Sequence, residues 1–149
     1  MAMVELRQVS FTYAGAEAAA IKNISFAVEA GEMACVCGAT GSGKSTLLRL
    51  IKRELTPMGQ LTGQVLLDGV PVASLPEDVS AFSIGYVMQR PDEQIVTDKV
   101  WHELAFGLEN MGLSQQEMAR RIAETAAYFG IESWYERPVS QLSGGQKQL

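Results

Sequence analysis

The sequence predicts an α/β protein with an antiparallel β subdomain near the N-terminus, a core around a glycine-rich loop, and a small helical subdomain. Three observations carry this prediction: apolar residues alternate with a period of two near the N-terminus, a short apolar run enters a glycine-rich loop, and amphipathic helical patterns follow. We expect the β subdomain at 1–32 and 60–75, the core at 33–56 and 80–91, and the helical subdomain at 92–149.

Composition limits the classes of function. The 149 residues are 47% hydrophobic, which is enough for one domain with a core. A formal charge of −5 argues against nucleic acid as a partner, since the basic pairs Lys52-Arg53 and Arg120-Arg121 are expected to be solvated helix faces. No run of eighteen apolar residues occurs, and the start lacks a charged-then-apolar leader, so we expect neither a membrane span nor export.

The first predicted strand changes register near Gln8, because its apolar positions fall on two alternations: Val4, Leu6, Val9, Phe11 and Tyr13. A loop of small residues at 14–20 separates it from a second strand, whose apolar residues are Ile24, Phe26 and Val28. Asp68-Gly69 then predicts a tight hairpin turn, because this pair readily adopts positive φ angles. These strands are expected to pair as an antiparallel sheet.

Two more strands are expected in the core. Residues 33–37 form the apolar run before the glycine loop, and residues 82–88 end before Pro91, which could not continue a central strand. Cys35 and Cys37 would point to one face of the first of these strands, and we expect them to be buried thiols. The alternative, a metal site, would need more ligands than the lone distant His102 supplies.

Helical spacing predicts three helices and a shorter fourth at 133–136. The first follows the glycine loop and stops at Thr56-Pro57, with apolar positions Leu47, Leu48, Ile51 and Leu55. The second has Thr97 or Asp98 as a cap and the apolar face Val100, Trp101, Leu104, Ala105, Leu108 and Met111. The third opens with a capping box from Ser114 to Glu117, ends at Gly130, and is expected to turn inward Met118, Ile122, Ala126 and Phe129.

The glycine loop has the pattern of a phosphate-binding site, and its residues are Gly38, Ala39, Thr40, Gly41, Ser42, Gly43, Lys44, Ser45 and Thr46. Small residues let the backbone wrap an anion and aim N–H groups at it, helped by the following helix. Lys44 adds a charge for the β and γ phosphates, and Ser45 adds a hydroxyl where a bridging Mg²⁺ would sit. This is a Walker A motif, and the expected strand before it and helix after it argue against a chance match; ATP and Mg²⁺ are the implied ligands.

A second glycine motif near the end of the chain is typical of another anion-binding helix start: Leu142, Ser143, Gly144, Gly145 and Gln146. The order of Walker A, a glutamine at Gln89 and this signature resembles the nucleotide-binding domain of ABC transporters, a family of P-loop NTPases, over nearly the whole chain. The resemblance implies that ATP lies between two such domains in a head-to-tail dimer. Ser143 and Gly145 would then bind the γ-phosphate held by the opposite domain.

The resemblance also implies roles for two other residues. Tyr13 lies where the family has an aromatic residue that stacks on adenine, although an aromatic at a strand end is more commonly part of a core. Gln89 matches the glutamine that reaches Mg²⁺ and senses the membrane partner, so Lys44 and Gln89 are the catalytic candidates in this chain.

Residues 89–110 resemble the energy-coupling-factor importers. Those importers use two ATPase domains on the cytoplasmic face of the membrane, a shared transmembrane coupling protein and an interchangeable substrate-binding membrane protein to take up vitamins or transition-metal ions. The resemblance implies a groove for cationic coupling helices, with candidate acceptors Asp92, Glu93 and Glu103. The alternative is a solvated acidic face.

The chain departs from the family pattern because it ends three residues after the signature. The Walker B aspartate, the adjoining glutamate and the switch histidine would all follow that point, and His102 precedes the signature. We therefore expect the front part of a longer protein that does not hydrolyse ATP alone. In the family's sheet the phosphate-loop strand lies between strands that follow the signature, so the resemblance also implies a parallel core sheet that is incomplete here and a chain that alone folds poorly. Two alternatives remain: a nucleotide-binding module without hydrolysis, and a non-transport ABC ATPase, for whose coiled coil the 52 residues between Gln89 and Leu142 leave little room.

Overall fold

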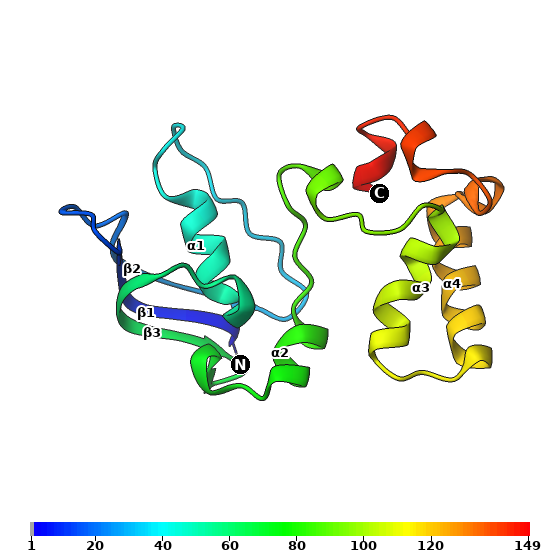
Figure 1. Ribbon diagram of the computed structural model, residues 1–149. Helices are drawn as coiled ribbons and strands as arrows, with labels where there is room; N and C mark the ends of the chain where they lie inside the picture. The colour runs from blue at the N-terminus through cyan, green and yellow to red at the C-terminus, as the bar shows by residue number, and fades with distance from the viewer. Residues whose placement is uncertain (1) are drawn as a thin grey trace. The chain divides into compact units, whose positions relative to one another are not determined.

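The computed structural model describes residues 2–149, apart from the side chain of Pro91. The chain divides into two compact units, Met1–Gly85 and Tyr86–Leu149, which we call the N-terminal unit and the helical unit (Figure 1). None of the helices within residues 2–149 is both long and apolar enough to cross a bilayer.

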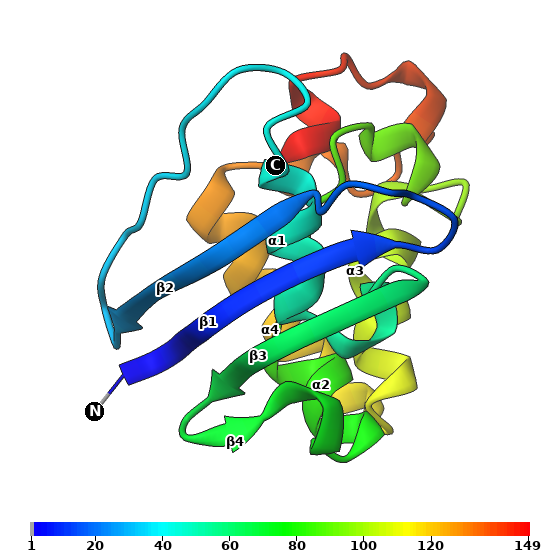
Figure 2. The same ribbon diagram turned by 90° about the vertical axis from the view of Figure 1, so that its left-hand side faces the viewer.

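The N-terminal unit is built on a four-stranded antiparallel sheet in the order β2-β1-β3-β4 (Figure 2). Its strands are β1 Ala2–Tyr13, β2 Ile21–Glu29, β3 Gly59–Leu67 and β4 Val70–Pro71. The Asp68-Gly69 turn joins β3 to β4 with φ angles of 47° and 79°. The predicted antiparallel strands and hairpin are confirmed.

The predicted irregularity of β1 lies at Gln8, which has a φ of 49°. The register of β1 shifts between Leu6 and Val9 against β2 and between Arg7 and Ser10 against β3. Opposite this bulge, a Cβ on Gly63 would lie 2.4 Å from the carbonyl oxygens of Arg7 and Gln8. Glycine at position 63 therefore lets β3 pass the bulge closely.

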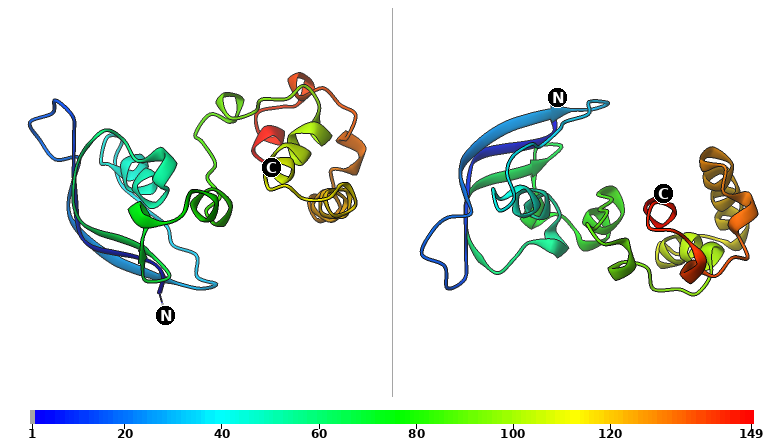
Figure 3. Two further views of the ribbon diagram at one scale, coloured as in Figure 1. Left: turned by 60° about the horizontal axis from the view of Figure 1, so that its bottom comes forward. Right: turned by 90° about the horizontal axis from the view of Figure 1, so that it is seen from above.

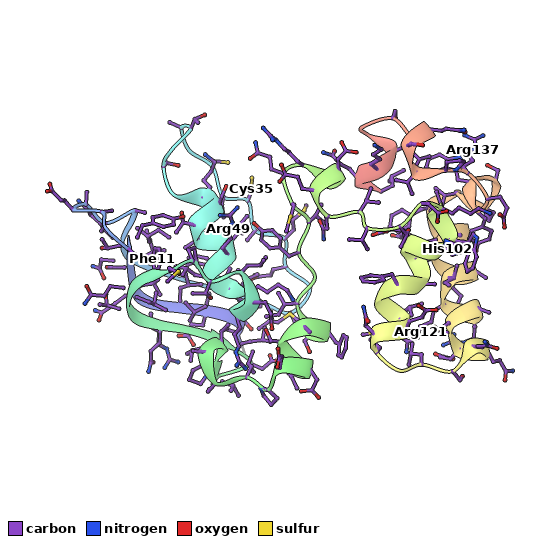
Figure 4. All side chains as sticks on the ribbon, viewed as in Figure 1. Phe11, Cys35, Arg49, His102, Arg121 and Arg137 are labelled. Carbon is purple, nitrogen blue, oxygen red and sulfur yellow. The ribbon has the colours of Figure 1, made fainter. Side chains whose placement is uncertain are left out.

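Helix α1, Lys44–Ile51, covers one face of the sheet (Figures 2 and 3). Phe11, labelled in Figure 4, is 1% exposed and belongs to the core between sheet and helix with Leu6, Val9, Leu47 and Leu50. Helix α1 is shorter than predicted, because Lys52 is extended and Arg53–Leu55 forms a separate 3₁₀ helix. Val72–Ser74 is a second 3₁₀ helix, and α2 is Glu77–Ser83.

The two predicted core strands are wrong for this structure. Residues 33–37 have no regular structure, and Met33 is 98% exposed. Phe82 and Ser83 end α2, and residues 84–88 have no regular structure. A central strand needs hydrogen-bonding neighbours on both sides, and no segment of residues 2–149 provides one for either run.

The expectation of buried thiols is also wrong, for the same reason. Cys35 and Cys37 are both exposed, because the segment that carries them does not join a sheet. Their Sγ atoms lie 3.4 Å apart, so the two side chains share one side of the segment as the spacing predicted.

The helical unit is centred on α3, Val100–Asn110, and α4, Gln115–Phe129, which lie side by side (Figures 1 and 3). The predicted cap at Ser114 is confirmed: Ser114 Oγ accepts a hydrogen bond from the backbone N–H of Glu117 at 3.3 Å. The Glu117 carboxylate, which a capping box would turn back to the Ser114 N–H, accepts hydrogen bonds from Arg120 and Arg121. Gly130 ends α4 with a φ of 65°. The unit also contains four 3₁₀ helices, Pro91–Glu93, Glu132–Trp134, Val139–Gln141 and Gln146–Gln148.

Two details of these helices differ from prediction. The N-cap of α3 is Lys99, which makes no side-chain cap bond, rather than Thr97 or Asp98. The apolar faces are buried only along a narrow stripe, Val100, Ala105 and Ala126, while three residues expected to face inward are at least one-third exposed: Trp101, Met111 and Phe129. A pair of helices without a second layer buries only the positions that face each other.

Candidate nucleotide-binding site

The glycine loop ends against the sheet at Gly43, the residue that caps α1. Gly43 has a φ of 93°, and a Cβ there would lie 2.6 Å from the carbonyl oxygen of Ala20. Residue Ala20 is itself held in place, because its N–H donates to the Phe11 carbonyl at 2.8 Å. Only glycine fits this junction, and the fit fixes the start of α1 beside β1 and β2.

The remaining loop glycines let the backbone curl. Gly38 and Gly41 have φ angles of 153° and 82°, in the region that favours glycine. The loop then runs into the first turn of α1, where the leading N–H groups of a helix lack intrahelical acceptors and carry partial positive charge. The loop and the helix start therefore form a backbone surface suited to an anion.

Lys44 folds back over this loop. Its Nζ donates to the carbonyl oxygens of Gly38 and Ala39, each at 2.8 Å. The ammonium group is thus held at the mouth of the loop by neutral carbonyl acceptors. Phosphate oxygens carry full charges and form stronger hydrogen bonds than these carbonyls, so they would replace one or both.

The two hydroxyl residues after Lys44 differ in what they can bind. Thr46 is 6% exposed, and its Oγ1 lies 2.7 Å from the Tyr13 hydroxyl, so it is already bonded within the unit. Ser45 is exposed in the first turn of α1. Ser45 is therefore the hydroxyl that can reach a ligand, and an oxygen donor of this kind suits Mg²⁺.

Tyr13 lies beside the start of α1 through its bond to Thr46. Its ring meets Phe11 edge to face, with ring centroids 5.1 Å apart and an interplanar angle of 84°. The residue is half-buried and packs against the core. Stacking of Tyr13 on adenine stays a prediction, and its position at the end of β1 near the loop is compatible with that role.

The signature segment lies in the helical unit and is closed by two reciprocal hydrogen bonds. The Ser143 N–H donates to Gln146 Oε1 at 2.9 Å, and the Gln146 N–H donates to Ser143 Oγ at 3.3 Å. A Cβ on Gly144 or Gly145 would meet open space, and neither residue has a positive φ. The chain's own packing therefore does not require these glycines, whereas close approach by an external group would.

Gln89 is exposed, and the segment before it is held by hydrogen bonds with the side chain of Gln94. The amide of Gln94 donates to the Tyr86 carbonyl at 2.8 Å and accepts from the Met88 N–H at 3.0 Å. Sequence reasoning missed Gln94, and the only signal for it was an amide side chain close behind a predicted strand. This clamp fixes the backbone that leads into Gln89.

The three acidic candidates of the partner groove all have partners within the helical unit. The Asp92 carboxylate forms an ion pair with Lys147, and Glu93 pairs with Arg90 at 3.1 Å. Glu103 Oε2 accepts from the backbone N–H groups of Val96 and Thr97 at 3.2 and 3.0 Å, and from the Thr97 hydroxyl at 2.9 Å. A cationic partner would have to share or replace these contacts.

Charged side chains elsewhere in the helical unit form local pairs, some of whose members are labelled in Figure 4. Hydrogen bonds from Arg120 and Arg121 lower the pKa of Glu117 to about 2. A hydrogen bond with His102 at 2.8 Å lowers the pKa of Asp98, and the bond to Glu136 raises the pKa of Lys99. Among the described residues, no three His, Cys, Asp or Glu side chains gather as a metal site.

In the N-terminal unit, Tyr13 contacts Thr46 at the end of the loop at 38–46. In the helical unit, Asp92 contacts Lys147 next to the signature at 142–146, and Gln89 lies in the same unit.

Three comparisons identify relatives of this chain. A Bacillus anthracis protein named as an ABC transporter ATP-binding protein is 43% identical over 149 residues, which are 100% of this chain and 27% of that protein. The energy-coupling factor transporter ATP-binding protein EcfA1 of Streptococcus pneumoniae is 38% identical over 147 residues, 98% of this chain and 52% of that protein. The solved structure of CbiO1 from Clostridium perfringens, described as part of the ABC transporter complex CbiONQ, has a TM-score of 0.84 at 30% identity and covers 99% of this chain and 58% of its own.

The chain therefore spans between about a quarter and somewhat over half of the length of these relatives. Its α/β fold, with an antiparallel sheet and helices, matches that of CbiO1. The family model described as ABC transporter matches residues 21–149. The chain belongs to the ABC transporter family and is similar to an energy-coupling factor transporter ATP-binding protein and to CbiO1.

Proposed function

We propose that this chain is the nucleotide-binding part of an energy-coupling-factor importer, which couples ATP binding and hydrolysis to the uptake of a vitamin or a transition-metal ion. The observation that carries the proposal is the phosphate loop, in which the Lys44 ammonium is held over the carbonyls of Gly38 and Ala39 beside the exposed Ser45. Similarity to EcfA1 and CbiO1 supports the importer class.

Each loop residue has a task in this proposal. Backbone N–H groups of residues 38–46 bind the phosphates, and Lys44 exchanges its carbonyl acceptors for the β and γ phosphate oxygens. Ser45 would hold Mg²⁺, which neutralises charge on the phosphates when bound, and Gln89 stays a predicted Mg²⁺ ligand in the helical unit. Tyr13 stacks on adenine, and its bond to Thr46 keeps the ring beside the loop.

The signature acts on a second ATP-binding domain. Ser143 and Gly145 contact the γ-phosphate of the ATP that the other domain holds, in a head-to-tail dimer. The support for this role is the pair of glycines at 144 and 145, which neither the chain's packing nor its backbone angles require.

The assembly also contains a transmembrane coupling protein and a substrate-binding membrane protein, so the ATPase is peripheral on the cytoplasmic face of the membrane. Asp92, Glu93 and Glu103 are the proposed acceptors for a cationic coupling helix. Reversing all three charges should abolish co-purification with the coupling protein at low salt, and intact assembly at both low and high salt would put the contact elsewhere.

Hydrolysis requires a general base and a Mg²⁺-binding aspartate, and in this family those residues follow the signature. We therefore propose that the full-length protein turns over ATP and that residues 1–149 alone do not. If the full-length protein binds ATP without hydrolysing it, the rival interpretation, a nucleotide-binding module without ATPase activity, is correct.

The direct test is substrate uptake by vesicles that contain the full-length protein with its membrane partners. Lys44→Ala should abolish both ATP turnover and uptake. Arg49→Ala is the matched control, because it removes a positive charge from the exposed side of the same helix, away from the loop. Uptake that persists in Lys44→Ala would contradict the proposal.

A further inference from the structure

One ion pair in the helical unit joins segments that lie far apart in the sequence. The Lys147 Nζ donates to Asp92 Oδ1, across a separation of 55 residues. Asp92 belongs to the turn that follows Gln89, and Lys147 directly follows the signature. The Lys147 side chain is 15% exposed, whereas that of Asp92 is 69% exposed, so the lysine reaches outward from a covered position to the carboxylate.

The Asp92 end of this pair is anchored to the glutamine segment. Pro91–Glu93 is a 3₁₀ helix, and the Glu93 N–H donates to the Arg90 carbonyl at 3.1 Å. The Gln94 amide holds the Tyr86 carbonyl and the Met88 N–H. Residues 86–94 are therefore tied to one another on both sides of Gln89.

The Lys147 end is anchored to the signature. The Lys147 N–H donates to the Ser143 carbonyl at 3.0 Å, inside the loop that the reciprocal bonds of Ser143 and Gln146 close. Lys147 also lines an apolar cavity with Leu142, Ile95 and Trp134. A displacement of Lys147 would therefore displace Ser143 and Gln146 with it.

We propose that Asp92 and Lys147 are positioning residues, through which the segment around Gln89 holds the signature in one orientation. This inference rests on the proposed function. A cationic side chain of the membrane partner that reached Asp92 would compete with Lys147 for one carboxylate. Docking at the groove would then loosen the signature without any contact to ATP.

The first test is amide hydrogen exchange at residues 142–148 in the full-length protein. Asp92→Asn keeps the shape of the side chain and removes its charge, so exchange should rise roughly two- to fivefold, as expected for an exposed ion pair. The matched control is Glu136→Gln, which removes another ion pair of the same unit, Lys99–Glu136, and should leave residues 142–148 unchanged. Equal exchange in Asp92→Asn and wild type would overturn the proposal.

The second test swaps the two charges of the ion pair. Asp92→Lys combined with Lys147→Asp should restore the exchange rates that either single variant raises, which mere loss of packing would not allow. ATP titration on the same proteins separates the two claims. If the wild type binds ATP but amide hydrogen exchange in the charge-swapped protein is as fast as in the single variants, the positioning role fails and the proposed function stands. If the wild type does not bind ATP, the proposed function itself fails.

Discussion

Replacing Gly43 with alanine tests how the loop is joined to the sheet. The new Cβ would lie 2.6 Å from the Ala20 carbonyl oxygen, closer than a real Cβ approaches any such atom. The oxygen cannot retreat cheaply, because the Ala20 N–H is bonded to the Phe11 carbonyl at 2.8 Å in the sheet. The loop must therefore move away from β2, and α1 must move with it.

The loss of stability expected for Gly43→Ala has two parts. A non-glycine residue in the left-handed region costs about 1–2 kcal/mol, and forcing extra atoms into a filled site adds about 1–3 kcal/mol. The matched control is Gly41→Ala, because Gly41 has a similar φ of 82° but nothing within 4 Å of its Cβ. Gly41→Ala should thus show only the first part, and the two variants should differ by about 1–3 kcal/mol.

Native-state hydrogen exchange of the α1 amides, measured without nucleotide, gives the free energy of opening in each variant. Gly43→Ala should lower it more than Gly41→Ala. If the two variants lower it equally, the contact with Ala20 carries no energy and the argument for this junction is refuted.

Three further predictions concern stability. Phe11→Ala empties the centre of the N-terminal core and should lower the free energy of unfolding by about 3–5 kcal/mol in urea denaturation; a loss below 1 kcal/mol would mean that the core is not packed as described. Ser114→Ala removes the cap of α4 and should lower the free energy of opening by about 1 kcal/mol in amide exchange of that helix, with Ser133→Ala as a control. The pKa of Glu117 is lowered by Arg120 and Arg121 to about 2 from 4.5, so its contribution to stability is present above about pH 4.5 and is lost as the pH falls towards 2. Glu117→Gln should remove that part of the pH dependence in acid titration of helicity, and an unchanged profile would contradict the pairing.

The antiparallel part of the fold could be predicted because its signals are local. The change of register at Gln8 and the Asp68-Gly69 turn each follow from the alternation and turn chemistry of a few adjacent residues. The cap of α4 at Ser114 is local in the same way, since Ser114 and Glu117 lie within one helical turn.

The prediction of two core strands is wrong, because a parallel strand depends on neighbours distant in sequence. The apolar runs at 33–37 and 82–88 have the composition of buried strands, but no strand within residues 2–149 pairs with them. Burial of Cys35 and Cys37 was inferred from the same assumption and is wrong with it. An apolar run can thus indicate a buried strand, but the strand forms only where neighbouring strands pair with it.

Some features of the candidate site could be predicted from the sequence, and others could not. The composition of residues 38–46 predicts a phosphate loop, and Lys44 lies over that loop. The bond between Tyr13 and Thr46, which leaves Ser45 as the reachable hydroxyl, joins β1 to α1 and has no sequence signature. The Gln94 clamp and the Asp92–Lys147 pair likewise depend on how the chain folds back on itself.

Binding of MgATP by the phosphate loop is the central claim, and equilibrium titration of a fluorescent ATP analogue tests it most directly. The full-length protein should bind the analogue, and Lys44→Ala should weaken binding by about 1.5–3 kcal/mol, which is about 10- to 150-fold in Kd. Arg49→Ala should bind as the wild type does. Unchanged affinity in Lys44→Ala would contradict the assignment of residues 38–46 as the nucleotide site.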